Sequence, residues 1–310
     1  MNEFELIARL TRSLPTNDAV VVGAGDDCAV LECGDPARQL LFKTDAVVEG
    51  IHFTRETPPE KIGRKALARC LSDIAAMAGT PNAALVTIAL PKQFSPEFVG
   101  KVYEGLNALA KQHGVAIVGG ETTTNPERIL ISIALTGFVP RGKAVLRSGA
   151  KVGDAIFVTG ELGGSLAGKH LDFAPRLGEA QWLAENFLVH ALMDVSDGLA
   201  GDLPHILRAS GVGAELLKSA VPISRAAKEN SKRGDAAKPA FVAALTDGED
   251  FELLFTVASK RAVPVLDAWK KRFPEVKLSC IGKIIEGEGL RLRDKTGIRP
   301  FTAHGYVHFS

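Results

Sequence analysis

The chain has 310 residues, which suggests about two domains of ordinary size. Its 46% apolar and 24% charged residues are typical of a soluble globular protein. The formal net charge is +1, so no strong electrostatic field draws the chain to nucleic acid or to an anionic membrane.

The N-terminal stretch MNEFELIARLTRSL combines acidic residues with an amphipathic spacing, and it contains no apolar segment long enough for a signal peptide. No stretch approaches the ~18 apolar residues of a membrane-spanning helix. The cysteines form no CxxC pair, and we expect them to be small buried side chains in a reducing compartment. They are Cys28, Cys33, Cys70 and Cys280. The sequence therefore predicts a cytoplasmic protein.

The first half of the chain mixes strand and helix patterns without a strict alternation. A helix over 59–78 opens on proline and ends on glycine, and a second over 95–113 is capped by Ser95. Apolar runs predict strands over 27–33, 39–48, 83–90, 116–120 and 128–139. The runs AALVTIAL and RILISIALTGFV are long for a domain of this size, so Ile131, Ile133 and Leu135 need cover, which we expect a second copy of the chain to provide in a homodimer.

A segment rich in glycine and basic residues, 140–154, lacks periodicity and marks a domain boundary. The second half then opens on a strand over 155–160 and a Gly-rich turn, ELGGSLAG. Further strands are predicted over 191–195, 251–257 and 278–285, and helices over 198–209 and 259–272. We predict an α+β fold with two mixed α/β domains, 1–142 and 143–310.

Acidic residues recur where the predicted apolar strands end. Taken singly, each has an alternative role as a helix cap or turn residue, and we keep that interpretation for Asp18 and Asp35. Asp73 is different, because it lies inside a predicted helix among apolar neighbours and caps nothing. The strand-end acids are Asp26, Asp27, Asp45, Glu121, Asp194, Asp197, Glu249 and Asp250.

So many carboxylates repel one another unless a cation or protons neutralise them. Mg²⁺ prefers oxygen ligands and commonly joins protein carboxylates to substrate phosphates. No HExxH motif or Cys/His cluster appears, which argues against zinc. The Walker GxxxxGK[ST] pattern and the protein-kinase signatures are also absent. Glycines beside the acids allow close approach of backbone N–H groups to phosphate. Arg147 is as well explained by phosphate binding as by a solvated linker, and for Arg141 the linker is favoured.

Several characteristic stretches run in order along nearly the whole chain. They are GDDCAV (25–30), TDAVVEGIHF (44–53), SDIAAMAG (72–79), VGGETT (118–123), RSGAKVGDAIFVTGELGGSLAG (147–168), MDVSDGLAGDLPHI (193–206), GEDFELLFT (248–256) and HGYVHF (304–309). EGIHF, DVSDGL and GEDFELLF are specific in combination. Together the stretches resemble the thiamine-monophosphate kinase family, which belongs to a superfamily with aminoimidazole-ribonucleotide synthetase, selenophosphate synthetase and the hydrogenase-maturation dehydratase.

The resemblance implies ATP-dependent phosphorylation of thiamine monophosphate to thiamine diphosphate, with several Mg²⁺ ions. It also implies a homodimer whose N-terminal strands form a shared barrel, with ATP at the interface. By position it implies metal ligands at Asp27, Thr44, Asp45, Asp73, Glu121, Asp194 and Asp197. It implies ATP contacts at Tyr103, Gly120, Arg147 and Ser196, and thiamine contacts at His52, Glu249 and Tyr306.

The chain departs from the family pattern at two places. Glu121 stands where the family usually has Asp, and Glu reaches farther. The segment between the Gly-rich turn and DVSDGL is also shorter than usual, which bears on the acceptor. Two alternatives therefore stay open: a superfamily enzyme acting on another phosphorylated small molecule, and an inactive nucleotide-binding relative.

No Ser, Cys or His lies beside a base in a nucleophile motif. We therefore expect the acceptor phosphate itself to attack the ATP γ-phosphorus in line, with no catalytic nucleophile on the protein. We expect no nucleic-acid or membrane partner.

Overall fold

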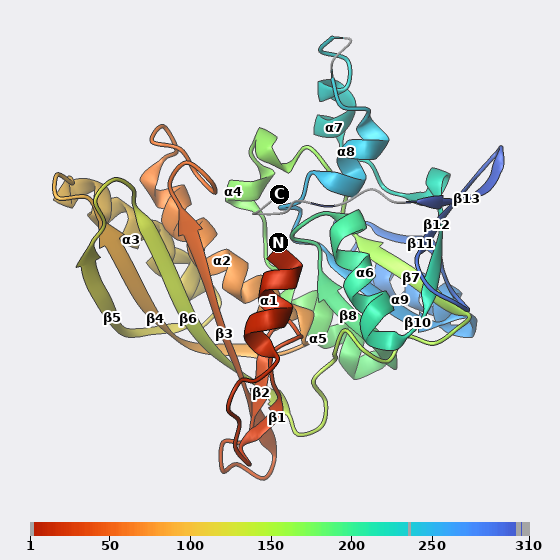
Figure 1. The fold of residues 1–310 in the computed structure, drawn as a ribbon, viewed down its shortest axis with the longest axis horizontal. Helices are drawn as coiled ribbons and strands as arrows, with labels where there is room; N and C mark the ends of the chain where they lie inside the picture. The colour runs from red at the N-terminus through yellow and green to blue at the C-terminus, as the bar shows by residue number, and fades with distance from the viewer. Residues whose placement is uncertain (1–2, 235–236, 302–304, 306–310) are drawn as a thin grey trace. The chain divides into compact units, whose positions relative to one another are not determined.

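The computed structural model describes residues 3–234, 237–301 and 305. They form two compact units (Figure 1). We call Ala19–Ala144 with His170–Leu177 the N-terminal unit. The C-terminal unit comprises Met1–Asp18, Val145–Lys169 and Gly178–Ser310. The chain passes from the N-terminal to the C-terminal unit at Ala144 and Val145, inside the predicted boundary segment. Residues 1–18 and 170–177 depart from the predicted contiguous domains 1–142 and 143–310, because each belongs to the other unit. Both units combine a sheet with helices, which confirms the α+β class.

The helices are α1 (Glu3–Thr11), α2 (Pro59–Ala76), α3 (Pro96–Gln112), α4 (Lys169–Asp172), α5 (Leu177–Asn186), α6 (Leu199–Ser210), α7 (Arg225–Asn230), α8 (Ala240–Thr246) and α9 (Ala262–Arg272), with 3₁₀ turns η1 (Ser165–Ala167), η2 (Lys218–Ala220) and η3 (Ser259–Arg261). The strands are β1 (Val20–Val22), β2 (Ala29–Leu31), β3 (Arg38–Val48), β4 (Thr80–Leu90), β5 (Ala116–Thr124), β6 (Leu130–Pro140), β7 (Asp154–Thr159), β8 (Val189–Asp194), β9 (Gly213–Leu217), β10 (Leu253–Ala258), β11 (Leu278–Ile285), β12 (Leu290–Asp294) and β13 (Gly297–Phe301).

The N-terminal unit is a six-stranded sheet in the order β1-β2-β3-β6-β4-β5, with α2 and α3 against one face (Figure 1). Side chains of β6 alternate strictly between buried and partly exposed, as expected for a sheet covered on one side. Ile131, Ile133 and Leu135 lie on the helix-covered face and are at most 1% exposed. The prediction that these three residues need outside cover was therefore wrong, because helices of the same unit bury them.

Two glycines allow α2 and α3 to pack with their backbones close together. A Cβ atom on Gly63 would lie 1.8 Å from the Val102 carbonyl oxygen, and one on Gly105 would lie 1.8 Å from that of Glu60. The contact is reciprocal, so a side chain at either position forces the helices apart.

We expect Gly63→Ala to destabilise the fold by about 1–3 kcal/mol or more, because the added methyl group overpacks a backbone contact. Gly100→Ala is the matched control, since Gly100 also lies in a helix but a Cβ there meets nothing within 4 Å. That control should gain about 0.5–1 kcal/mol from the better helix propensity of alanine. Urea denaturation of both variants tests the pair, and equal midpoints would contradict the close-packing argument.

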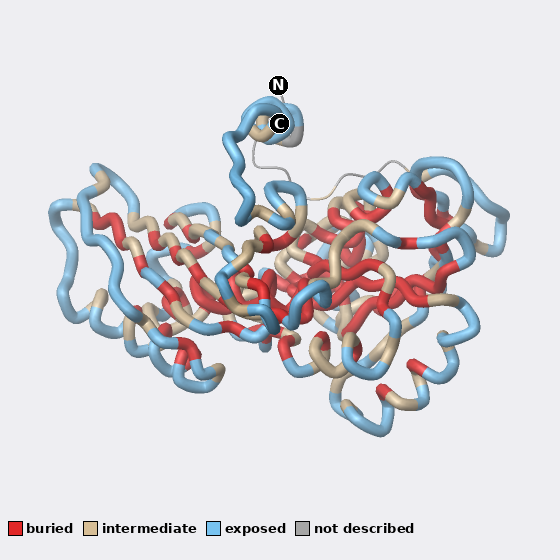
Figure 2. Tube along the Cα trace, turned by 90° about the horizontal axis from the view of Figure 1, so that it is seen from below, coloured by how far each residue is buried: buried red, intermediate tan, exposed pale blue. Residues whose placement is uncertain are grey.

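The C-terminal unit contains a seven-stranded sheet in the order β13-β12-β9-β11-β7-β10-β8. Pairing is antiparallel except between β12 and β9. The interior strand β7 and the edge strand β8 are both almost wholly buried, and α6 contributes Leu203 and Ile206 to the same core. Figure 2 shows buried and exposed segments along the chain trace, and exposure is not confined to the connections, since the edge strand β5 is exposed along nearly its whole length.

The cysteine prediction was half right: Cys28 and Cys70 are buried, whereas Cys33 and Cys280 are exposed. All four are free thiols. Among the described residues, no helix has both the length and the hydropathy needed to cross a bilayer.

Candidate active site

Three predicted metal ligands meet on the helix-covered face of the N-terminal sheet, and we call Asp27, Asp45 and Asp73 the acidic cluster. Asp27 precedes β2, Asp45 lies within β3 and Asp73 lies within α2. Asp27 and Asp73 are 3% and 8% exposed, and carboxylate oxygens of the two lie within 4.8 Å of each other. Two buried hard oxygen donors at this spacing fit a cation such as Mg²⁺.

Two basic side chains enter the same cluster. The Nζ of Lys43 lies 3.1 Å from Asp73 Oδ2. The Nε and Nη2 of Arg69, on α2, donate to the two carboxylate oxygens of Asp45 at 2.9 and 3.2 Å. Burial raises the pKa of Asp45, but the charges of Arg69 and Lys43 outweigh burial and hold it below its usual value. Burial lowers the pKa of Lys43, but the charges of Asp73 and Asp45 raise it by a larger amount, so the net shift is upward.

Thr44 and Glu121 lie on the opposite, open face of the same sheet. Thr44 follows Lys43 on β3, so its side chain alternates to the other face, where its Oγ1 is 3.4 Å from Ser132 Oγ. Glu121 pairs with Thr87, and Thr87 pairs with Ser132. The predicted ligands of this unit are therefore divided between two faces.

Two acids lie within strands rather than at strand ends, contrary to our prediction. β3 continues past Asp45 to Val48, and β5 continues past Glu121 to Thr124. In β5, Gly120 lies against the backbone of β4, and a Cβ there would be 1.8 Å from the Val86 carbonyl oxygen. Tyr103, the other predicted ATP contact of this unit, is half-buried on α3.

His52 lies in the turn that follows β3. Its Nδ1 accepts a hydrogen bond from the Val48 N–H at 3.0 Å, and its carbonyl accepts one from Lys65 Nζ at 2.7 Å. These bonds fix the ring in the turn. Beside the turn lies a pocket of about 880 Å³ with an aromatic lining of Phe53, Phe94 and Phe98.

In the C-terminal unit, Asp194 is the last residue of β8, and the loop that follows carries Ser196 and Asp197. The loop that enters β10 carries Glu249, which has a positive φ of 54°. Backbone bonds join the two loops: the Glu249 N–H donates to the Ser196 carbonyl at 2.6 Å, and the Phe251 N–H donates to the Val195 carbonyl at 2.7 Å. A predicted ATP contact and a predicted thiamine contact are thus held side by side.

Sequence reasoning missed Asp202, which is 1% exposed at the start of α6. Its Oδ2 accepts the Asp197 N–H at 3.0 Å. Burial, and then the charges of Asp197 and Asp194, raise the pKa of Asp202 well above its usual range, while Arg147 opposes them. The signal was an aspartate directly before Leu203 and one helical turn before Ile206, both of them apolar.

Tyr306 lies outside the described residues. The described residue before it, Gly305, packs on the Asp197 loop, where an added Cβ would be 2.4 Å from the Asp197 carbonyl oxygen.

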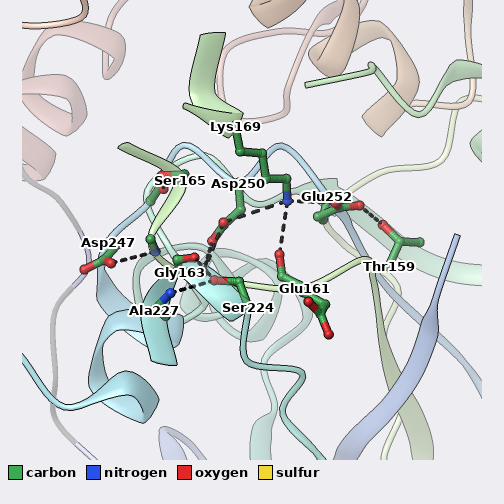
Figure 3. Close-up of polar contacts among 12 residues, drawn as sticks. Thr159, Glu161, Gly163, Ser165, Lys169, Ser224, Ala227, Asp247, Asp250 and Glu252 are labelled. Carbon is green, nitrogen blue, oxygen red and sulfur yellow. Dashed lines mark hydrogen bonds and ion pairs between the residues drawn. The ribbon is translucent and has the colours of Figure 1, made fainter. Parts of the chain in front are cut away.

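A second buried network connects the Gly-rich turn to the Glu249 loop (Figure 3); it contains Asp250, a predicted strand-end acid, whereas its other members were not predicted. The Gly163 N–H donates to both oxygens of Asp250 at 3.0 Å, and the Gly164 N–H donates to Asp247 Oδ2 at 2.8 Å. Lys169 Nζ lies 2.8 Å from Glu252 Oε1 and 3.9 Å from Asp250 Oδ1. The charges around Asp250 are therefore Lys169, Glu252 and Asp247. Burial raises the pKa of Asp250 to about 7, although Lys169 and the Gly163 N–H lower it.

This raised pKa predicts a pH-dependent stability. Unfolded aspartate titrates near pKa ~3.9, so the protonated form of Asp250 stabilises the folded chain, and this contribution is lost as the pH rises through about 7. Asp250→Asn fixes a neutral side chain. The free energy of unfolding of the unmodified chain, measured relative to this variant, should fall between about pH 4 and pH 7 and level off at higher pH.

Chemical denaturation across this pH range checks the expectation. Asp35→Asn is the control, because Asp35 has a lowered pKa, set by the Ala37 N–H and the Arg38 side chain, and stays ionised throughout. A pH-independent difference for Asp250→Asn would contradict the assignment.

Comparison with known proteins now places these two units in a class. Residues 25–139 match the family model of the AIR synthase related protein, N-terminal domain, and residues 151–295 match that of the C-terminal domain. A thiamine-monophosphate kinase of Rhodopirellula baltica is 40% identical to the chain over 96% of its length and 93% of the relative. The thiamine-monophosphate kinase of Bacillus subtilis is 32% identical over the whole of both chains. A solved structure described as AaThiL complexed with AMPPCP and TMP has a TM-score of 0.82 and 31% identity, covering 99% of this chain and 97% of that one.

The class defined by these matches is that of the two-domain AIR synthase related proteins. Within that class, the chain belongs to the thiamine-monophosphate kinase family.

Proposed function

We propose that this chain transfers the γ-phosphoryl group of ATP to thiamine monophosphate, which gives thiamine diphosphate and ADP. The observation that carries the proposal is the full-length similarity to a chain solved with AMPPCP and TMP. AMPPCP is an analogue of ATP, so that complex holds the two kinds of substrate that such a transfer requires.

In the proposed mechanism, a terminal phosphate oxygen of the acceptor attacks the γ-phosphorus, and the bond to the β,γ-bridging oxygen breaks as ADP leaves. The protein contributes positioning and charge rather than a covalent nucleophile. We assign nucleotide contacts to Tyr103, Gly120, Arg147 and Ser196. We assign acceptor contacts to His52, Glu249 and Tyr306.

The carboxylates suit Mg²⁺ as the cation that neutralises the phosphates. When bound, Mg²⁺ would supply Lewis-acid stabilisation of the charge on the transferring phosphoryl group. We propose ligands from the acidic cluster together with Asp194 and Asp197 of the C-terminal unit, and from Thr44 and Glu121 on the open face. The hydrogen bond from the Asp197 N–H to Asp202 supports that loop as a preformed element.

We also propose a homodimer in which the open face of the N-terminal sheet is covered by a second copy in a shared barrel. Phe42 and Leu85 are 47% and 48% exposed on this face, beside the polar residues Thr44 and Glu121. A second copy would bury apolar surface and bring the predicted open-face ligands into an enclosed site. The four free thiols support a reducing, cytoplasmic setting.

A coupled assay of ADP release over a panel of phosphorylated acceptors tests the function. Thiamine monophosphate should raise ADP release well above the rate with ATP alone, and unphosphorylated thiamine should not. A different preferred acceptor would leave a phosphotransferase but overturn the substrate, and no acceptor-dependent release would indicate an inactive relative. A phosphoenzyme trapped with labelled ATP would overturn direct transfer.

A further inference from the structure

The acidic cluster already contains a cation that the proposed mechanism does not use. Lys43 points to the helix-covered face of β3, and its Nζ lies 3.1 Å from Asp73 Oδ2. The Lys43 and Asp73 side chains are only 25% and 12% exposed. The ammonium therefore lies where a divalent ion ligated by Asp73 would place its charge.

The charges of the cluster are nearly balanced without a metal. Three carboxylates, Asp27, Asp45 and Asp73, face the ammonium of Lys43 and the guanidinium of Arg69. Arg69 engages both oxygens of Asp45, and the Ala46 N–H donates to one of them at 2.7 Å. Among these five side chains of the N-terminal unit one negative charge remains, so they attract a divalent ion less strongly than their three carboxylates alone would.

The surroundings of Lys43 favour a resident ammonium over one that a metal displaces. Leu41 and Val47 lie on the same face of β3 and are at most 1% exposed. The buried thiols of Cys28 and Cys70 are close enough for the Lys43 charge to affect their pKa values. Displacement from Asp73 would put an ammonium among these apolar groups, and an unpaired buried charge is costly.

We propose that Lys43 is a built-in cation of the acidic cluster, so that the cluster binds one divalent ion fewer than the same carboxylates bind when residue 43 is neutral. The inference deepens the proposed phosphoryl transfer, because part of the charge neutralisation then comes from the protein itself. Lys43 thus neutralises charge on the carboxylates of the cluster and does not itself contact the substrate.

Mn²⁺ binding to the full chain, measured calorimetrically without nucleotide, tests the proposal. Lys43→Met and Lys43→Gln should each bind one more Mn²⁺ per chain than the unmodified protein. Their melting temperatures should rise with added Mn²⁺ by more than that of the unmodified protein. Lys61→Met is the matched control, because Lys61 also pairs with an aspartate, Asp172, but that pair is 41% and 50% exposed. The control should bind the same number of ions as the unmodified chain.

Equal ion counts in the Lys43 variants and the unmodified chain would overturn the proposal, because they would mean that metal and ammonium do not compete for one position. Insolubility of both variants at every Mn²⁺ concentration would overturn it as well, since an ion should then replace the lost charge. The measurement uses neither ATP nor acceptor, so a failed kinase assay leaves this count unaffected. A failed count likewise leaves the kinase assay unaffected.

Discussion

Asp73→Asn is expected to lower the rate of ADP formation by about 100-fold or more, the usual cost of removing a group that stabilises developing charge in phosphoryl or acyl transfer. The substitution keeps the volume of the side chain and removes the charge that the proposed metal site needs. It also breaks the ion pair with Lys43, so the melting temperature should fall. A broken buried pair commonly costs about 3–5 kcal/mol.

The double variant Lys43→Met/Asp73→Asn separates the two effects. It removes both charges of the pair, so it should recover most of the lost stability while staying inactive. Melting temperature and ADP formation are measured on the same samples. A destabilised Asp73→Asn protein with normal specific activity would remove Asp73 from the metal site, and an active, fully stable one would also show that the ion pair is unimportant.

Leu85→Lys should convert the proposed homodimer into a monomer and remove most of the activity. Leu85 is 48% exposed on the open face, so a lysine there fits the isolated chain but buries a charge against a second copy. Light scattering at micromolar concentration reports the mass, and the ADP assay reports the activity.

The matched control is Leu188→Lys, because Leu188 is 75% exposed and lies in the C-terminal unit. It should keep the mass and activity of the unmodified chain. A monomeric unmodified chain, or a dimeric Leu85→Lys variant with normal activity, would contradict the assignment of this face.

Local patterns in the sequence predicted the long elements well. Proline at the first helical position and a following glycine set α2, and the apolar run of β11 was predicted with its observed bounds. The short strands β9, β12 and β13 were missed, because pairing with neighbouring strands stabilises them more than their own composition does.

The site was predicted less completely than the fold, for a related reason. Asp27 and Asp73 could be predicted because a carboxylate among apolar residues is costly unless it is paired or bound to a cation. Asp202 carries a similar signal that the prediction did not use, whereas Lys43 carries none, since its importance comes from residues that folding brings to it. Residues 1–18 belong to the C-terminal unit and residues 170–177 to the N-terminal unit. This assignment likewise depends on packing between residues far apart in the sequence.

The central claim is that the γ-phosphoryl group passes directly to thiamine monophosphate. One incubation of the chain with Mg²⁺, thiamine monophosphate and ATP labelled at the γ-phosphorus, followed by separation of the products, tests it most directly. We expect the label in the terminal phosphate of thiamine diphosphate, with one ADP formed for each thiamine diphosphate and no label on the protein. Label that remains in ATP, or is released only as inorganic phosphate while thiamine monophosphate is unchanged, would contradict the account.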